Sequence, residues 1–150
     1  MPQAETHPVR VQLGRVMRID SFGQPATTTE IAEVELALDV KFPGWLRHLY
    51  LACNGFTGPS GWPYLLALGD SDGVLQFNLF LRAEFAYPWL NRAVIFASNT
   101  GSGTSTVHFA AVDGKLVEWC IGDEDEYTTF KHSIFDLYKR EQAAWDKIVS

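Results

Sequence analysis

The stretch TTTEIAEVELALDVKFPGWLRHLYLACNGF, residues 27–56, predicts two helices joined by a short link. Thr27 and Glu30 form a capping-box pattern, in which the hydroxyl and the carboxylate satisfy backbone N–H groups at the start of a helix. The apolar residues that follow are spaced for one buried face, and the acidic residues fall largely on the outer side. The predicted buried positions are Ile31, Val34 and Leu38, and the predicted outer positions are Glu33, Glu35 and Asp39.

The second half of this stretch predicts another helix and its end. Pro43 suits the first turn of a helix, because a residue there needs no N–H donor. The apolar residues that follow recur at positions i, i+3, i+4 and i+7, which is the spacing of one helix face. They are Leu46, Leu49, Tyr50 and Cys53. The pair Asn54-Gly55 then predicts a left-handed C-terminal end.

This order of signals resembles the SUKH superfamily, which takes in fungal cell-wall-synthesis regulators and many bacterial immunity proteins. Its signature is a capped helix reading roughly I-x-x-x-E-x-x-L, a short link, a Pro, a helix of aromatic and Leu residues, and an Asn-Gly end. The matching positions are Ile31, Glu35, Leu38, Pro43, Leu46, Tyr50, Asn54 and Gly55. The link reads Asp39-Val40-Lys41-Phe42, where family members usually carry a Gly and a Leu-Pro pair.

Length and composition are those of one globular domain. The chain has 150 residues, of which 47% are hydrophobic and 13% aromatic. We expect a single SUKH-like domain over residues 1–150, with residues 1–8 loose. No apolar run is long enough to cross a bilayer, and the start MPQAETHPVR lacks the apolar core of a signal peptide. We therefore expect a cytoplasmic protein that does not bind membranes.

The charge of the chain predicts a basic partner. The net charge is −6, which argues against direct nucleic-acid binding, because phosphate affinity requires concentrated Lys and Arg. The acids are concentrated between residues 113 and 126, where Lys115 is the one basic residue. An acidic patch of this kind speeds and favours encounter with a basic protein.

The rest of the chain predicts an α+β fold, with the helical hairpin, a mostly antiparallel sheet of about four to six consecutive strands, and a C-terminal helix packed on the sheet. Asp113-Gly114 is a two-residue hairpin signal, and Ser133 with Asp136 predicts the start of the last helix. The predicted strands are Tyr64–Leu68, Ala93–Ser98, Thr104–Val112, Lys115–Ile121 and Tyr127–Lys131.

Two segments are less definite. Over residues 9–19 the apolar residues fit both the alternation of a strand and the spacing of a helix, and SUKH members often begin with a helix here, so both types stay open. Val74–Leu81 is another apolar stretch, and Arg82–Leu90 is expected to hold a short helical turn ended by Pro88.

No residue set predicts catalysis. The candidates for a nucleophile or a base lie in no recognisable motif, and we expect the two helix or strand histidines among them to be surface or rim residues. They are His48, His108, Cys53, Ser102 and Ser105. Burial on a core face would raise the thiol pKa of Cys53 and leave it inert, and Cys53 and Cys120 are expected to be buried hydrophobes rather than a disulfide. Because the cysteines and histidines show no paired ligand spacing, we expect no bound metal. We also expect no cofactor and, without a catalytic motif, no enzymatic activity.

The acidic loop of residues 123–126 has two interpretations. Such runs are most often solvated connections, which is the interpretation that the sequence alone favours. The other is a contact surface for a basic protein, in which acids steer the partner and neighbouring aromatic side chains, Trp119 among them, anchor it. The candidate contact residues are Trp62, Tyr64, Glu118, Asp123, Glu124, Asp125, Glu126 and Tyr127. Trp62 and Tyr64 lie on a loop rich in Gly and Pro, from which they can also fold back onto the hairpin.

The resemblance implies a function for that surface. SUKH immunity proteins neutralise toxins, many of them nucleases, by binding them, so we expect a bacterial immunity protein that occludes a basic cognate toxin domain. The alternatives are a regulatory or scaffold domain like that of the fungal members, and a small-ligand-binding domain with a pocket between sheet and helices.

Overall fold

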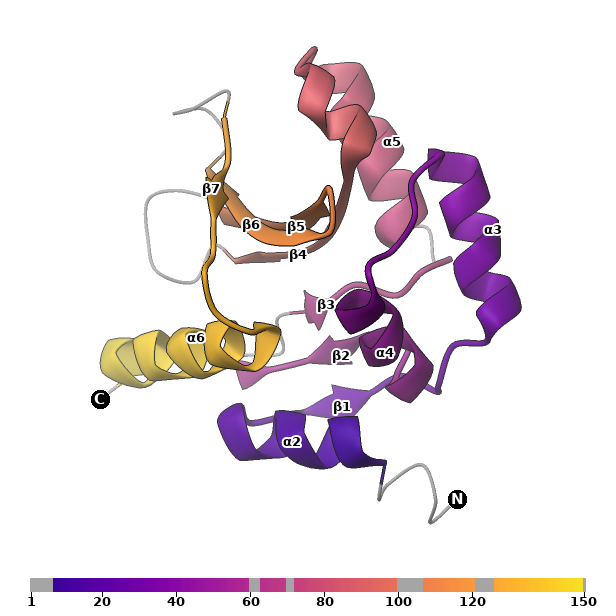
Figure 1. The fold of residues 1–150 in the computed structure, drawn as a ribbon. Helices are drawn as coiled ribbons and strands as arrows, with labels where there is room; N and C mark the ends of the chain where they lie inside the picture. The colour runs from indigo at the N-terminus through magenta and orange to yellow at the C-terminus, as the bar shows by residue number, and fades with distance from the viewer. Residues whose placement is uncertain (1–6, 60–62, 70–71, 100–106, 121–125, 150) are drawn as a thin grey trace.

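The computed structural model shows the expected α+β fold, with helices around two antiparallel sheets (Figure 1). It describes residues 7–59, 63–69, 72–99, 107–120 and 126–149. The helices within these ranges are α2 (Pro8–Val16), α3 (Thr28–Leu38), α4 (Gly44–Ala52), α5 (Val74–Glu84), the 3-10 helix η2 (Pro88–Arg92) and α6 (Ile134–Val149). None of the described helices is long and apolar enough to span a membrane.

The strands form a three-stranded and a four-stranded sheet in place of the one sheet that the sequence predicts. The orders are β1-β2-β3 and β4-β5-β6-β7. The backbone N–H of Leu66, just after β3, donates to the carbonyl of Phe96 in β4 at 2.8 Å, so the two sheets are joined edge to edge. The strands are β1 (Ser21–Phe22), β2 (Phe56–Thr57), β3 (Pro63–Leu65), β4 (Ala93–Asn99), β5 (Val107–Val112), β6 (Lys115–Cys120) and β7 (Thr128–Thr129).

The start of the helical hairpin is confirmed in detail, and its end differs from the prediction. The Thr27 hydroxyl accepts from the N–H of Glu30, whose carboxylate accepts from the N–H of Thr27. Helix α4 ends at Ala52, and Cys53 is extended. The left-handed residue is Gly55, with a φ of +97°, where a Cβ would lie 3.0 Å from the Leu65 carbonyl. It therefore serves the turn into β2 rather than the helix end.

Glu35 is buried, which corrects its predicted place on the outer side of α3. Its exposed fraction is 4%, and its carboxylate accepts from the Arg47 guanidinium at 2.8 Å. It also accepts from the backbone N–H of Phe42 at 2.7 Å. The link between the helices turns inward and leaves this N–H without a backbone acceptor, so the polar face of α3 has to supply one.

Residues 8–16 form helix α2, which resolves the two types that the sequence left open. The ring nitrogen Nδ1 of His7 accepts from the N–H of Val9, and Pro8 occupies the first turn, so these two residues are ordered rather than loose. Arg10 donates to the Ala52 carbonyl at 2.7 Å and to the Gly23 carbonyl at 2.8 Å. These contacts fix α2 against α4 and the end of β1.

Helix α5 lies between β3 and β4, so the strands are not consecutive as predicted. The buried side chain of Asn78 accepts from the N–H of Ile95 and donates to its carbonyl, at 2.8 and 2.9 Å. Ile95 borders the irregularity in the pairing of β4 with β5, so Asn78 supplies hydrogen bonds as a neighbouring strand would. Pro88 begins the 3-10 helix η2, whereas the sequence predicted that it would end a helical turn.

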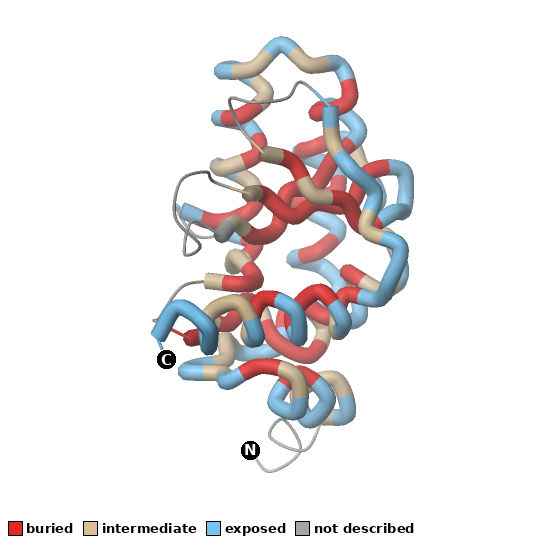
Figure 2. The backbone as a smooth tube through the Cα atoms, turned by 90° about the vertical axis from the view of Figure 1, so that its left-hand side faces the viewer, coloured by how far each residue is buried: buried red, intermediate tan, exposed pale blue. Residues whose placement is uncertain are grey.

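Strands β4 and β5 of the four-stranded sheet carry buried residues on both faces (Figure 2), whereas both residues of β7 are exposed. As predicted, Val107, Phe109 and Ala111 of β5 share one face, where they pack with α2, α3, α4 and α6 in the larger core. The other face carries a second core, which includes Trp89, Trp119 and Leu81. Asp113 and Gly114 both have positive φ and close the predicted hairpin between β5 and β6. The predicted cap of α6 is confirmed by a bond from the N–H of Asp136 to the Ser133 hydroxyl.

Truncating the carboxylate that joins α3, the link and α4 is expected to destabilise the fold strongly. Glu35→Ala leaves Arg47 without its partner and the Phe42 N–H without an acceptor, which should lower the free energy of unfolding by about 3 kcal/mol. Urea unfolding measures the change, and Glu33→Ala, at an exposed position of the same helix, is the control with a change within about 0.5 kcal/mol. Equal effects of the two substitutions would contradict this role of Glu35.

Candidate functional site

An aromatic cluster covers the face of the four-stranded sheet that points away from the helical hairpin. Trp119 of β6 lies at its centre and makes edge-to-face contacts with Phe85, Tyr87 and Trp89, at centroid distances of 5.5, 5.9 and 5.1 Å. Tyr127 extends it by an edge-to-face contact with Trp89 at 5.0 Å. Edge-to-face contact is the favoured arrangement of aromatic rings, so the cluster is a set of mutually supporting side chains.

The cluster has a buried base and a partly exposed outer layer. Trp119 and Trp89 are buried, whereas Phe85, Tyr87 and Tyr127 are half-buried. Phe85 follows the end of α5, Tyr87 directly precedes η2, and Tyr127 directly precedes β7, whereas Trp89 lies in η2 and Trp119 in β6. Rigid aromatic side chains that are supported from below and open above are typical anchors of protein interfaces.

The sequence identified only part of this cluster. Tyr127 and Trp119 were predicted as aromatic anchors, and of these Tyr127 is partly accessible while Trp119 is buried. Phe85, Tyr87 and Trp89 were missed because their segment was predicted only as a short helical turn ended by Pro88, without a role in a contact surface. The signal that would have found them is the density of aromatic residues between Phe77 and Trp89.

His108 lies beside the cluster and is buried, which corrects its predicted place at the surface or rim. It pairs across the sheet with Ser98 on one side and Trp119 on the other. Its Nδ1 is 2.5 Å from the Ser98 hydroxyl, and among the described residues its Nε2 has no hydrogen-bond partner. Burial lowers the pKa of His108 to about 4, so the ring is neutral at physiological pH.

Tyr64 is not an exposed anchor and instead belongs to the core. Its exposed fraction is 3%, and its ring meets the ring of Tyr138 edge to face at 6.3 Å. Burial, with a smaller effect of Glu141, raises the pKa of Tyr64 to about 12. Of the two outcomes that the sequence allowed for this side chain, folding back onto the protein is the correct one.

Glu118 and Tyr127 do not share a surface. Glu118 lies on the face of β6 opposite to Trp119, where it pairs with Arg140 of α6. Arg140 also binds Glu141 at 2.9 Å, and these hydrogen bonds and charges raise its pKa against the opposing effect of burial. Glu118 therefore joins β6 to α6, and its role as a contact residue stays a prediction.

Two predicted contact residues meet at the edge of the cluster, where exposed Glu126 precedes half-buried Tyr127. The others, Trp62, Asp123, Glu124 and Asp125, lie outside the described residues, so their predicted role stays a prediction. In the sequence, residues 121–125 join the end of β6 directly to Glu126.

The candidate nucleophiles and bases are not assembled into a catalytic set in the described part of the chain. His48 is exposed on α4, and burial raises the pKa of the Cys53 thiol to about 12, as expected for a core cysteine. Cys53 and Cys120 form no disulfide with each other. Ser102 and Ser105 lie outside the described residues. No group of three or more His, Cys, Asp or Glu side chains within the described ranges could hold a metal ion.

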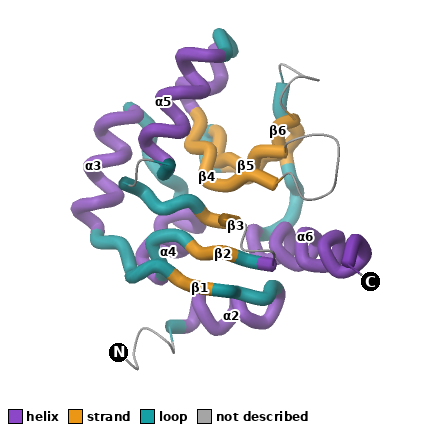
Figure 3. Tube along the Cα trace, turned by 180° about the vertical axis from the view of Figure 1, so that it is seen from behind, coloured by secondary structure: helices purple, strands orange, loops and turns teal. Residues whose placement is uncertain are grey.

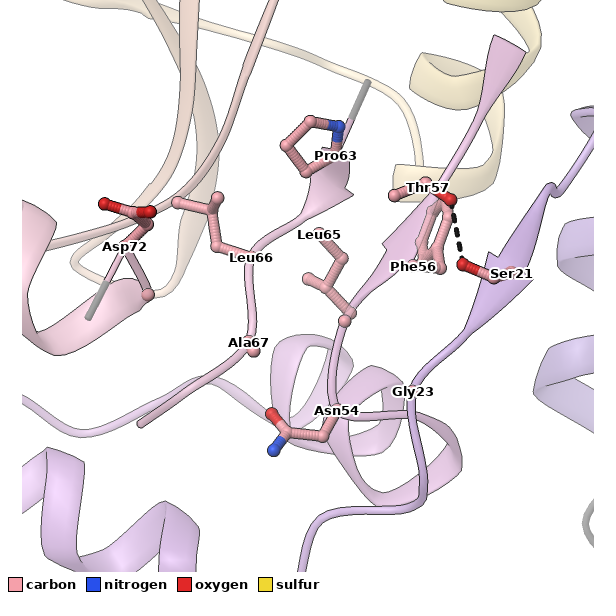
Figure 4. A pocket seen from close by; sticks show the side chains of 12 residues that line it. Ser21, Gly23, Asn54, Phe56, Thr57, Pro63, Leu65, Leu66, Ala67 and Asp72 are labelled. Carbon is pink, nitrogen blue, oxygen red and sulfur yellow. Dashed lines mark hydrogen bonds between the residues drawn. The ribbon is translucent and has the colours of Figure 1, made fainter. Parts of the chain in front are cut away.

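A cavity of about 270 Å³ lies along β2 and β3 (Figure 4), the strands that Figure 3 shows beside β1 in the smaller sheet. The described residues that line it contribute mostly backbone and small or apolar side chains, and Asp72 is the one titratable side chain among them. The Ser21 and Thr57 hydroxyls are hydrogen-bonded to each other across the sheet at 3.0 Å. This lining provides neither an acid–base pair nor an activated nucleophile.

Residues 25–140 match the SMI1 / KNR4 family (SUKH-1), which is well over half of the chain. The match begins just before the capped helix α3 and ends within α6, so it includes both sheets except β1. No curated protein matches the chain.

The buried ring of His108, with its lowered pKa, predicts a loss of stability in mild acid. The unfolded chain binds a proton at this residue near pH 6.5, and the folded protein only near pH 4, so stability falls as the pH drops through this interval. His108→Gln should remove about 2 kcal/mol of the decrease in unfolding free energy between pH 7.5 and 4.5.

Urea unfolding at the two pH values measures this difference. His48→Gln, which replaces an exposed histidine, should keep the pH dependence of the unsubstituted protein. The assignment to His108 is wrong if His108→Gln loses as much stability on acidification as His48→Gln does.

Proposed function

Since the chain belongs to the SMI1 / KNR4 family (SUKH-1), we propose that it is a bacterial immunity protein that binds and neutralises a cognate toxin in the cytoplasm. It acts by binding alone, without catalysis. The family membership supports an immunity or a regulatory role, and the surface of this chain favours the first because its features suit one tightly bound basic partner.

The observation that carries the proposal is the aromatic cluster at the end of the acidic loop. Tyr127 is both the last ring of the cluster and the residue after four consecutive acids, Asp123 to Glu126. Aromatic rings on a rigid base supply desolvated contact area at little cost in side-chain entropy. Acids beside them attract a basic surface over longer distances and speed its encounter.

Neutralisation then works by occlusion. A nuclease toxin needs a basic surface to hold the phosphates of its substrate, and this surface is what an acidic protein of net charge −6 attracts. Once the acids have oriented the toxin, the rings of the cluster bury apolar area against it and slow dissociation. The toxin's substrate channel is blocked while the two proteins stay bound.

Purification of the native protein from its own cell, with its bound proteins, tests the proposal. We expect it to retain the product of a neighbouring gene, and that product to be toxic when expressed alone and harmless with this protein. If the neighbouring product is harmless and no toxin is retained, the proposal is wrong. A retained partner without toxicity would indicate the regulatory or scaffold role instead.

Neutralising the acids next to the cluster is expected to weaken partner binding. Replacement of Asp123, Glu124, Asp125 and Glu126 by Asn and Gln removes the long-range attraction, so the affinity should fall and its salt dependence should flatten. Calorimetric titration at two salt concentrations measures both effects.

The control is a variant with the same net charge but acids removed elsewhere. Replacing the exposed acids Asp20, Glu33, Asp72 and Asp146 by their amides also changes the net charge from −6 to −2. This variant should lose much less affinity than the loop variant. Equal losses would mean that net charge, and not the loop, is what the partner recognises.

A further inference from the structure

Two of the half-buried rings of the aromatic cluster directly follow exposed acidic residues in the chain. Exposed Glu84 directly precedes Phe85, and exposed Glu126 directly precedes Tyr127. Neither carboxylate forms an ion pair with any described residue, in contrast to Glu35 and Glu118, which are both paired with arginines. At two positions of the outer layer, an exposed acidic residue therefore precedes a ring of the cluster in the chain.

No arginine or lysine side chain of the described residues stacks on Phe85, Tyr87 or Tyr127. Within the described ranges the two arginines that stack on a ring lie elsewhere, Arg10 on Phe22 and Arg140 on Phe130. The two arginines nearest to the cluster in sequence are engaged by other groups. Arg82 donates to the carbonyls of Leu38, Leu90 and Ala93, and Arg92 pairs with Asp113 at 3.3 Å.

From these observations we propose that the outer rings of the cluster, Phe85, Tyr87 and Tyr127, bind an arginine or lysine side chain of a basic partner protein. The face of an aromatic ring is negative and attracts a cation, and the attraction is stronger where the cation is removed from water. Glu84 and Glu126 supply the opposite charge beside the rings. That the partner is a toxin rests on the proposed function. That its contacting side chain is an arginine or lysine rests on the aromatic cluster.

A cation suits this surface better than the other groups that an aromatic cluster can bind. Nucleic-acid bases stack on exposed rings, but their phosphates need basic residues, and the residues that directly precede Phe85 and Tyr127 are exposed acids instead. A purely apolar segment would bury the carboxylates without compensation. Arginine can stack its planar guanidinium on a ring and at the same time donate to a carboxylate.

Titration of the whole protein, labelled with ¹⁵N, with a hexa-arginine peptide tests the inference without the natural partner. The neutral control is a hexa-citrulline peptide, which keeps the size and most hydrogen-bond donors of arginine but lacks its charge. We expect hexa-arginine to shift the backbone amides of Phe85, Tyr87 and Tyr127 and the indole N–H of Trp89, and to bind at least tenfold more tightly than hexa-citrulline.

Substitutions separate the rings from the general negative charge. Tyr127→Leu should weaken hexa-arginine binding by roughly tenfold, and Tyr127→Phe, which keeps the ring and serves as a check on folding, should keep most of it. Phe80→Leu is the matched control, because Phe80 is 58% exposed on α5 and has no ring contact with a described residue. It should bind as the unsubstituted protein does.

Three outcomes would overturn the inference. They are equal binding of the two peptides, hexa-arginine shifts confined to residues 123–126 with none at the rings, and unchanged binding by Tyr127→Leu. None of them bears on whether the protein retains and neutralises a toxin, which the co-purification decides. Conversely, a cationic site could be present in a protein that has a regulatory partner, so the two proposals fail separately.

Discussion

The buried carboxylate of Glu35 holds together the part of the chain from which the rest is built. It accepts hydrogen bonds from Arg47 of α4 and from the N–H of Phe42 in the link, so one side chain fixes the end of α3, the link and the start of α4. A buried charge is tolerated only with such partners. With the hairpin fixed, α3 packs on α5 and α4 packs on α2.

Two buried tyrosines join the helices to the sheets by hydrogen bonds. The hydroxyl of Tyr50 in α4 donates to the Leu66 carbonyl, and that of Tyr138 in α6 donates to the Tyr64 carbonyl, each at 2.7 Å. Both carbonyls belong to β3 or the residue after it, where the two sheets join. The hairpin and α6 therefore hold the larger sheet from one side. Its other side is left to α5 and η2, which cover it only in part and carry the aromatic cluster.

How far the candidate site could be predicted depended on burial. Glu118, Trp119 and Tyr127 are close in sequence and were grouped as one contact surface, yet Glu118 and Trp119 are on opposite faces of β6, Trp119 is buried, and half-buried Glu118 is paired with Arg140. Aromatic residues in a turn-rich loop are equally compatible with exposure and with burial, and Tyr64 proved to be buried. The acidic residues 123–126 directly precede Tyr127 in the sequence, but the rings around Tyr127 come from segments far away in the sequence.

The sequence by itself determined the local elements: the capping boxes of α3 and α6, the amphipathic hairpin, the Asp113-Gly114 turn and the alternation of β5. Each of these depends on hydrogen bonds or side-chain spacing within a few residues, so local propensity decides it. Only the tertiary structure decided that Glu35 and His108 are buried and that Asn78 joins α5 to β4 by hydrogen bonds. It also decided that the rings of the aromatic cluster lie around Trp119. In these cases the partner lies elsewhere in the chain, and the free energy of burial, rather than local preference, determines where the side chain lies.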